Sequence, residues 1–108
     1  MINIPYTQME LDVALLCLSN KMEEKEELLE SLVIEMEEKT GKTQAERNKK
    51  IAEFHGISVS DFLNSPNLTK LAEIFVQDLT FQLKDKLKEK MDISDKEAWA
   101  IITYVNKN

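Results

Sequence analysis

Hydrophobic residues recur at helical intervals along most of the chain. Between residues 8 and 39 they alternate at spacings of four and three, which is typical of one face of a helix that packs on others. This series comprises Leu11, Leu15, Leu18, Met22, Leu29, Leu32 and Met36. Lys25 takes the one charged position in it. Further apolar residues beside the series broaden it, and a broad stripe favours a helix bundle over a strict two-stranded coiled coil.

Two interpretations of this segment are open. Thr7-Gln8-Met9-Glu10 has the form of a capping box, so a helix is predicted to begin there. Because no Gly or Pro follows before Gly41, one continuous helix of about 48 Å could fill the segment. Alternatively, Asn20-Lys21-Met22-Glu23 is a second capping box and predicts a break near Asn20. The acidic residues 23–27 would then lie in the first turns of a new helix, where the helix dipole favours them.

The rest of the chain predicts further helices, each opened by a Ser or Thr that can cap it. We expect them at about residues 44–54, 59–64, 66–91 and from 95 onward, with the caps Thr43, Ser58 or Ser60, Ser65 and Ser94. Thr43 and Ser94 each open a capping box, with Glu46 and Glu97 three positions later. Gly41 and Gly56 suit the helix ends. No stretch alternates as a strand does. We therefore predict an all-α protein, a five- or six-helix bundle with a long N-terminal helix and a helix-turn-helix-like segment, forming a single domain over residues 1–108.

Charge is unevenly distributed along the chain. The formal net charge is −6, but residues 1–41 carry ten acidic and three basic residues, a balance of −7, while residues 42–108 are close to neutral. An acidic N-terminal part repels nucleic acid and attracts a basic partner. With 43% hydrophobic and 31% charged residues, the composition is that of a globular protein.

The residues that usually carry chemistry are scarce. His55 is the sole histidine and Cys17 the sole cysteine, which excludes a disulfide within the chain, a multi-histidine zinc site and a histidine dyad. No phosphate-binding Gly loop is present. We therefore expect no enzyme, no cofactor and no catalytic or metal-binding residue. The N-terminus lacks the features of a secretory signal, and the longest apolar run, Val13–Leu18, is far too short to cross a membrane, so a cytoplasmic protein is expected.

The stretch KKIAEFHGISVSDFL, residues 49–63, resembles the helix-turn-helix proteins. Ala52 provides the small residue where two helices cross, and Gly56, four positions later, provides the turn. The apolar residues that would hold the two helices together are Ile51, Ile57 and Phe62. Two features depart from the pattern: His55 takes a position that is usually apolar, and Ser65-Pro66 ends the second helix early.

The charges of this segment weaken a prediction of DNA binding. Affinity for duplex DNA comes largely from cationic side chains at phosphates, yet no Lys or Arg lies between Ile57 and Thr69. Cationic residues precede the turn, and polar residues follow it. The candidate DNA contacts are Arg47, Lys49, Lys50, Ser58, Ser60 and Asn64.

Taken together, these patterns predict a small non-enzymatic regulator or inhibitor, of bacterial or phage type, that binds a protein partner or a second copy of itself. The acidic amphipathic N-terminal helix would form the contact. The expected seam residues are Leu29, Leu32, Val33 and Met36, with Glu30 and Glu37 at the rim. The alternative is a helix-turn-helix transcriptional regulator that binds DNA and dimerises through the same N-terminal helix.

Overall fold

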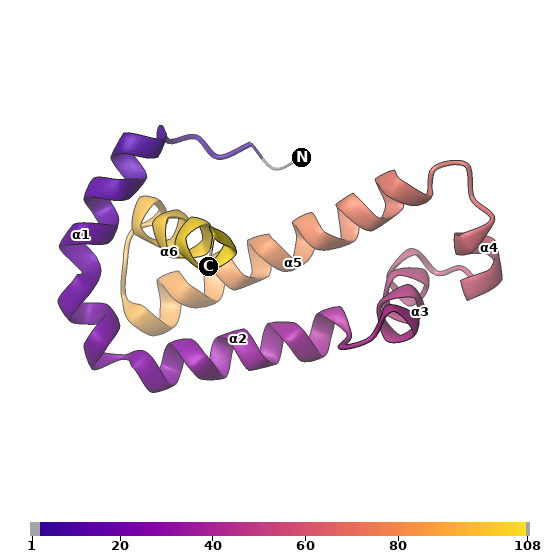
Figure 1. Ribbon diagram of the computed structural model, residues 1–108, viewed down its shortest axis with the longest axis horizontal. Helices are drawn as coiled ribbons and strands as arrows, with labels where there is room; N and C mark the ends of the chain where they lie inside the picture. Colours follow the sequence, from indigo (N-terminus) through magenta and orange to yellow (C-terminus); the bar gives the residue numbers. More distant parts are fainter. Residues whose placement is uncertain (1–2, 108) are drawn as a thin grey trace.

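The computed structural model describes residues 3–107, which form six α-helices and no β-strand (Figure 1). The prediction of an all-α protein is confirmed. The helices are α1 (Gln8–Glu24), α2 (Glu26–Thr40), α3 (Gln44–His55), α4 (Val59–Leu63), α5 (Leu68–Met91) and α6 (Asp95–Lys107).

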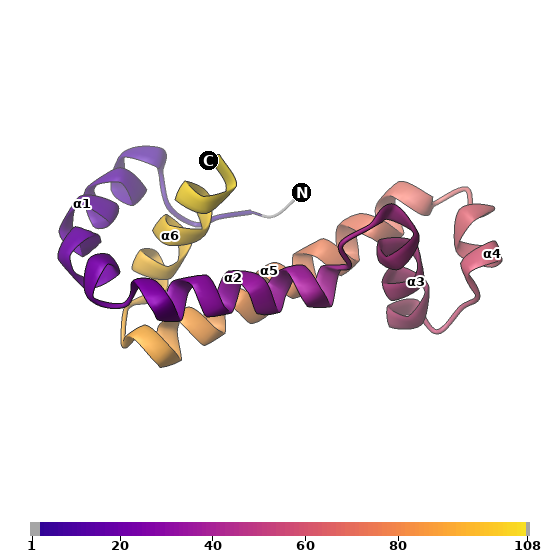
Figure 2. The same ribbon diagram turned by 60° about the horizontal axis from the view of Figure 1, so that its bottom comes forward.

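The molecule is elongated rather than spherical. α2 and α5 lie side by side along the long axis, with α1 and α6 at one end and α3 and α4 at the other (Figures 1 and 2). The extents are 46 × 28 × 22 Å, and the radius of gyration is 15.6 Å. A compact domain of this length would have a radius of gyration of about 13 Å. The chain therefore leaves more surface open than a domain of its size usually does.

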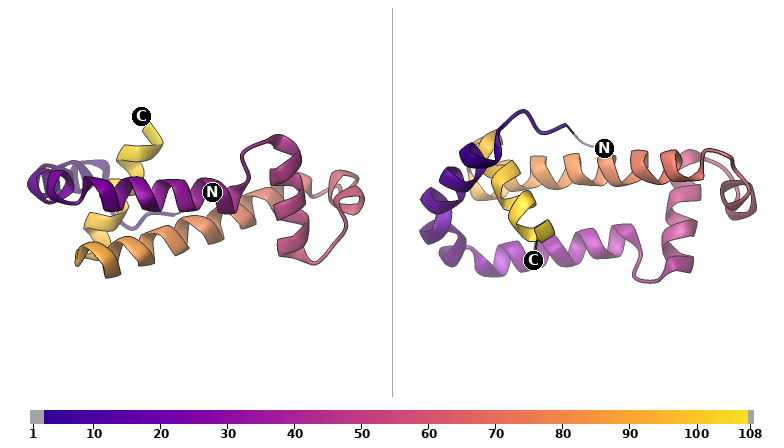
Figure 3. Two further views of the ribbon diagram at one scale, coloured as in Figure 1. Left: turned by 90° about the horizontal axis from the view of Figure 1, so that it is seen from below. Right: turned by 45° about the horizontal axis from the view of Figure 1, so that its top comes forward.

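The acidic N-terminal segment consists of two helices that meet at a corner, seen at the lower left of Figure 1. The corner is Lys25, whose backbone angles of φ −114° and ψ 27° lie outside the helical range. The prediction of one continuous helix is wrong, since the segment is broken into two helices. The break lies at Lys25 and not near Asn20, which is within α1. The bend occurs at the one charged position of the apolar series, where it turns α1 back across α6 (Figure 3).

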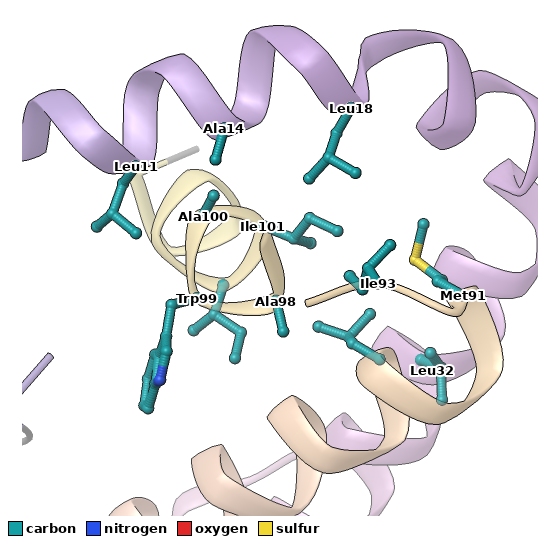
Figure 4. Close-up of a cluster of buried hydrophobic side chains, with 12 residues drawn as sticks. Leu11, Ala14, Leu18, Leu32, Met91, Ile93, Ala98, Trp99, Ala100 and Ile101 are labelled. Atoms are coloured by element: carbon teal, nitrogen blue, oxygen red, sulfur yellow. The ribbon is translucent and has the colours of Figure 1, made fainter. Parts of the chain in front are cut away.

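The larger hydrophobic core lies at the α1–α6 end. There α1 and α6 make the most extensive helix–helix contact, and Leu11, Ala14 and Leu18 point from α1 toward α6 (Figure 4). The buried members of this core are Leu11, Ala14, Leu18, Leu32, Leu87, Met91, Ile93, Ala98, Trp99, Ala100, Ile101 and Ile102. A second, smaller core joins α3, α4 and α5 and is built on Ile51, Ala52, Phe62 and Phe75. Because α5 contributes to both, it connects the two ends.

Two of the predicted capping boxes form in full. At α1, Thr7 Oγ accepts from Glu10 N at 3.2 Å while the Glu10 carboxylate accepts from Thr7 N. At α6, Ser94 and Glu97 make the same reciprocal pair, at 3.2 and 3.0 Å. Thr43 caps α3 by accepting from Glu46 N at 3.1 Å.

Other helix ends differ from the prediction. The Glu46 carboxylate accepts from Lys42 N rather than from Thr43 N, so the box at α3 is incomplete. α5 begins at Leu68, not at Pro66, because Ser65 Oγ accepts from Asn67 N and holds a turn there instead. Pro66 therefore precedes the helix.

Gly41 allows α2 and α3 to meet closely. It is buried, with φ +96°, a conformation that side chains rarely adopt. A Cβ atom at this position would lie 2.7 Å from the main-chain nitrogen of Arg47. Glycine is therefore required both by the backbone angle and by the approach of α3.

Candidate docking surfaces

α1 carries an apolar face on each of two opposite sides. The inner face packs on α6 through Leu11, Ala14 and Leu18. The outer face presents Met9, Val13 and Leu16, which are 76%, 55% and 76% exposed. Their spacing of four and three places them in one row. We call Met9, Val13 and Leu16 the outer stripe.

Acidic residues border the outer stripe. Glu10, Asp12 and Glu23 are exposed on α1. The only basic residue of this helix, Lys21, reaches away from the stripe and donates to the main-chain oxygen of Asp92 at 3.0 Å. Cys17 is also exposed, beside the stripe. Lys96 and Glu97 of α6 line a depression together with Met9, Val13 and Cys17. The outer face of α1 therefore combines a row of large apolar side chains with a border in which acidic residues outnumber the one lysine, Lys96.

The predicted seam of α2 lies mainly against the chain itself. Leu32 is only 3% exposed and belongs to the larger core, so it is not accessible to a partner. Leu29, Val33 and Met36 are half-buried and face a groove beside α5 and α6. Glu30 and Glu37 are exposed, as expected of rim residues.

This groove runs between α2, α5 and the end of α6, and we call it the α2–α6 groove. Its inner part, of about 160 Å³, is lined by apolar side chains and Tyr104. Its outer part, of about 470 Å³, extends to the turn between α2 and α3. The two parts share Val33, Leu83 and Val105. The two parts therefore form one continuous depression, which is apolar at its inner end, where Met22 of α1 also contributes, and more polar at its outer end, where α3 contributes Arg47.

Charged side chains lie at the outer end of the groove. Lys42 and Arg47 line it together with Glu37. Neither cation is within ion-pair distance of a carboxylate among residues 3–107, and Arg47 Nη2 donates only to Gln44 Oε1, at 3.3 Å. The mouth of the groove thus offers two cations for an acidic group from outside.

The helix-turn-helix-like segment has a short second helix. Gly56 adopts the left-handed conformation between α3 and α4, as the turn requires, but α4 has only five residues, about 8 Å. Ser58 Oγ accepts from Asp61 N at 3.0 Å, and Asn64 Nδ2 donates to Ser60 O at 2.9 Å. The polar candidates for DNA contact therefore take part in local helix capping. The cationic candidates Lys49 and Lys50 are exposed on α3, where Arg47 is half-buried.

His55 links the end of α3 to α5. Its Nε2 lies 2.8 Å from the main-chain oxygen of Leu71 and so ties the end of α3 to α5. Because a carbonyl oxygen can only accept, Nε2 carries the proton in this contact. The ring also lies beside that of Phe54.

Asp95 joins three parts of the chain at the larger core. Tyr6 OH donates to Asp95 Oδ2 at 3.1 Å, and the ammonium groups of Lys84 and Lys88 lie 3.3 and 3.5 Å from Oδ1. Burial alone would raise the pKa of Asp95, but the hydrogen bond from Tyr6 and the two cations outweigh it and lower the pKa. This cluster holds the segment before α1 against α5 and α6.

A second charged contact joins the two long helices. Lys86 of α5 donates to the carboxylate of Glu35 on α2, and Lys39 lies 3.6 Å from the same oxygen. The hydrogen bond from Lys86 lowers the pKa of Glu35, although desolvation opposes it. This contact joins α2 to α5.

Metal-binding clusters and membrane-spanning helices are both absent from residues 3–107. No three His, Cys, Asp or Glu residues of this range come together in a way that could hold a metal ion. None of its helices combines the length and the apolar character needed to cross a membrane. Comparison of the chain with protein-family models, with curated proteins and with solved structures found no match.

The sequence predicted the α2 seam but not the outer stripe. The α2 seam was predicted from the helical spacing of its apolar residues, but the sequence did not show that α5 and α6 would cover part of it. The outer stripe was visible only as extra apolar residues beside the main series. Their exposure depends on which side of α1 meets α6, and this is a property of the tertiary packing.

Proposed function

We propose that this protein is a non-enzymatic regulator or inhibitor that acts by binding a protein partner through the outer face of α1. The observation that carries the proposal is the outer stripe, Met9, Val13 and Leu16, exposed and bordered by acidic residues. A single exposed leucine is ordinary in a soluble protein. Three large apolar residues in one row along a helix are the anchors that helix-based recognition uses.

The total surface of the chain supports this proposal. The accessible area is 7158 Å². A monomeric protein of 12.5 kDa exposes about 6,200 Å², so this chain exposes about 1,000 Å² more. One partner in a standard protein–protein interface buries about 800 Å². The excess is therefore of the size that docking of one partner would cover.

The acidic border defines the chemistry of the partner. Charges at the rim of an interface increase the rate of association and exclude partners of like charge. A matching surface would present an apolar depression with cationic residues around it. Binding would act by occlusion, since the partner surface that holds the stripe is no longer free for other contacts.

We do not extend the proposal to DNA binding. The second helix of the segment is short, and Ser58 and Asn64 are engaged in local hydrogen bonds. The acidic α1 and α2 would also repel a duplex, because like charges raise the free energy of approach. These three features therefore do not favour a nucleic acid over a protein as the partner.

Site-specific photocrosslinking tests the proposal. A photoreactive amino acid replaces Leu16 in the stripe, and a matched chain carries it at Glu89, an exposed position of α5. We expect light to join the Leu16 chain to a protein in the cells that produce it, and the Glu89 chain to give much less product. Equal yields at the two positions, or no adduct at Leu16, would contradict the proposal.

A further inference from the structure

We propose that the partner of the outer stripe is a second copy of this chain, which receives the stripe in its α2–α6 groove. This inference rests on the function proposed above and names the partner of the same surface. The two surfaces lie on different parts of one molecule, so copies would join head to tail. Each copy would use its α1 toward one neighbour and its groove toward the other.

Charge complementarity is the first argument for this pairing. α1 carries four acidic residues and one lysine, and that lysine, Lys21, is engaged with the end of α5. The mouth of the groove presents Lys42 and Arg47 without carboxylate partners among the described residues. Lys50, one turn after Arg47 on α3, is also exposed. An acidic helix attracts the two cations of the mouth, although Glu37 at the same mouth and Glu46, whose carboxylate accepts from the main-chain nitrogen of Lys42, reduce the effect.

Apolar complementarity is the second argument. The outer stripe extends over about 10 Å of helix from Met9 to Leu16. The inner part of the groove, at about 160 Å³, resembles in size the apolar cavity of about 150 Å³ that is known to admit a benzene ring. It can therefore take one side chain of the size of Leu or Met. The wider outer part, about 470 Å³, can hold the rest of the row.

A symmetric pairing of α1 with α1 would be unfavourable. In a twofold contact the same patch meets itself, so the acidic border of one copy, Glu10, Asp12 and Glu23, would meet the acidic border of the other. Like charges in such positions lower affinity. The groove offers the opposite charge on the same chain, which favours the head-to-tail arrangement.

Head-to-tail contact has a consequence that symmetric dimers lack. Each added copy leaves one stripe and one groove free at the ends, so the assembly closes into a ring where the rotation between copies allows it and otherwise continues to grow as an open filament. Growth should increase with protein concentration. It should also decrease as salt is added, because the ionic rim lies at an exposed interface.

Complementation between two blocked variants tests the inference. Leu16→Asp blocks the stripe, and the double variant Lys42→Glu with Arg47→Glu blocks the mouth of the groove. All three residues lie at the surface or close to it, so the fold should be kept, and circular dichroism checks this. Leu63→Asp on α4, at a position 50% exposed and outside both surfaces, is the matched control.

We expect sedimentation velocity to show assemblies of the wild type and of Leu63→Asp that grow with concentration. Each blocked variant alone should remain a monomer, and an equal mixture of the two should form dimers and nothing larger, because only one intact stripe and one intact groove can meet. A mixture that remains monomeric, or a wild type that is monomeric at every concentration, would overturn the inference.

The crosslinking experiment separates this inference from the function on which it rests. A Leu16 adduct with the mass of two chains supports both. An adduct with a different protein, together with a monomeric wild type, supports the proposed function and overturns self-association. The absence of any Leu16 adduct overturns both.

Discussion

The Nζ atom of Lys25 lies 3.3 Å from the main-chain oxygen of Lys90, at the corner between α1 and α2. Lys21, one turn earlier, makes the same kind of contact with the oxygen of Asp92. The last carbonyl groups of a helix have no partner within the helix and carry partial negative charge. Two lysines of the N-terminal segment thus cap the end of α5. Lys25, the charged residue that interrupts the apolar series, therefore helps to hold α1 and α2 against the end of α5.

Removing these two caps should destabilise the chain. We expect the double variant Lys21→Met with Lys25→Met to lower the free energy of unfolding by about 1 kcal/mol, since cations near a helix C-terminus contribute about 0.3–1 kcal/mol each. Urea unfolding followed by circular dichroism measures the change. Lys49→Met, at an exposed position on α3, is the control and should have little effect. An equal loss of unfolding free energy in the double variant and in Lys49→Met would argue against a capping role for Lys21 and Lys25.

The two glycines should respond differently to alanine. Gly56 has φ +69°, and a Cβ atom added there would meet no other atom within 4 Å, so Gly56→Ala should cost about 1 kcal/mol from backbone strain alone. At Gly41 the added carbon would also meet main-chain atoms of Glu46 and Arg47 at 2.8 and 2.7 Å. We expect Gly41→Ala to cost more than about 3 kcal/mol. Thermal unfolding of both variants provides the comparison, and similar losses would contradict the close approach of α3.

The two faces of α1 should differ in their effect on stability. Leu18 is 1% exposed on the inner face, and Leu16 is 76% exposed on the outer face. We expect Leu18→Ala to lower the free energy of unfolding by about 2–5 kcal/mol, because it leaves a cavity in the larger core. Leu16→Ala should change it by less than about 0.5 kcal/mol. Chemical denaturation measures both, and a large loss at Leu16 would show that the outer stripe is covered within the chain.

The pKa of Asp95 should depend on Tyr6. The ordinary pKa of an Asp side chain is 3.8, and here it is lowered. A lowered pKa means that Asp95 stabilises the fold above pH 3.8 and that this stabilisation is lost as the pH falls through the lowered value. Tyr6→Phe removes one hydrogen bond to the carboxylate, so the pKa of Asp95 in the folded chain should rise. The stabilisation above pH 3.8 should then be smaller, and its loss on acidification should be complete at a higher pH.

Nuclear magnetic resonance of the Asp95 carboxyl carbon measures this change directly. Tyr104→Phe is a suitable control, because Tyr104 lies nine residues further along α6, about 14 Å away along the helix axis. It should leave the titration of Asp95 unchanged. An identical titration curve in the wild type and in Tyr6→Phe would show that the hydrogen bond from Tyr6 contributes nothing to the pKa.

Local sequence signals predicted several helix ends correctly. The caps at Thr7, Thr43 and Ser94 form as expected, because a cap depends on residues within one turn of each other. The start of α5 was misplaced by two residues, since Ser65 can cap a helix or a turn with the same hydroxyl group. The corner at Lys25 was not predicted, because its lysine contacts a helix that lies more than sixty residues away.

The sequence by itself determined that the chain is helical, where most of its helices begin and end, and that its N-terminal part is acidic. These properties depend on helical periodicity and on hydrogen bonds between near neighbours. Only the tertiary structure decided that α1 turns at Lys25, that its outer stripe stays exposed, and that Val33, Leu83 and Val105 border one groove. The physical reason is that an apolar residue gains the same free energy from burial against any apolar neighbour. Which neighbour it meets is settled by the packing of whole helices.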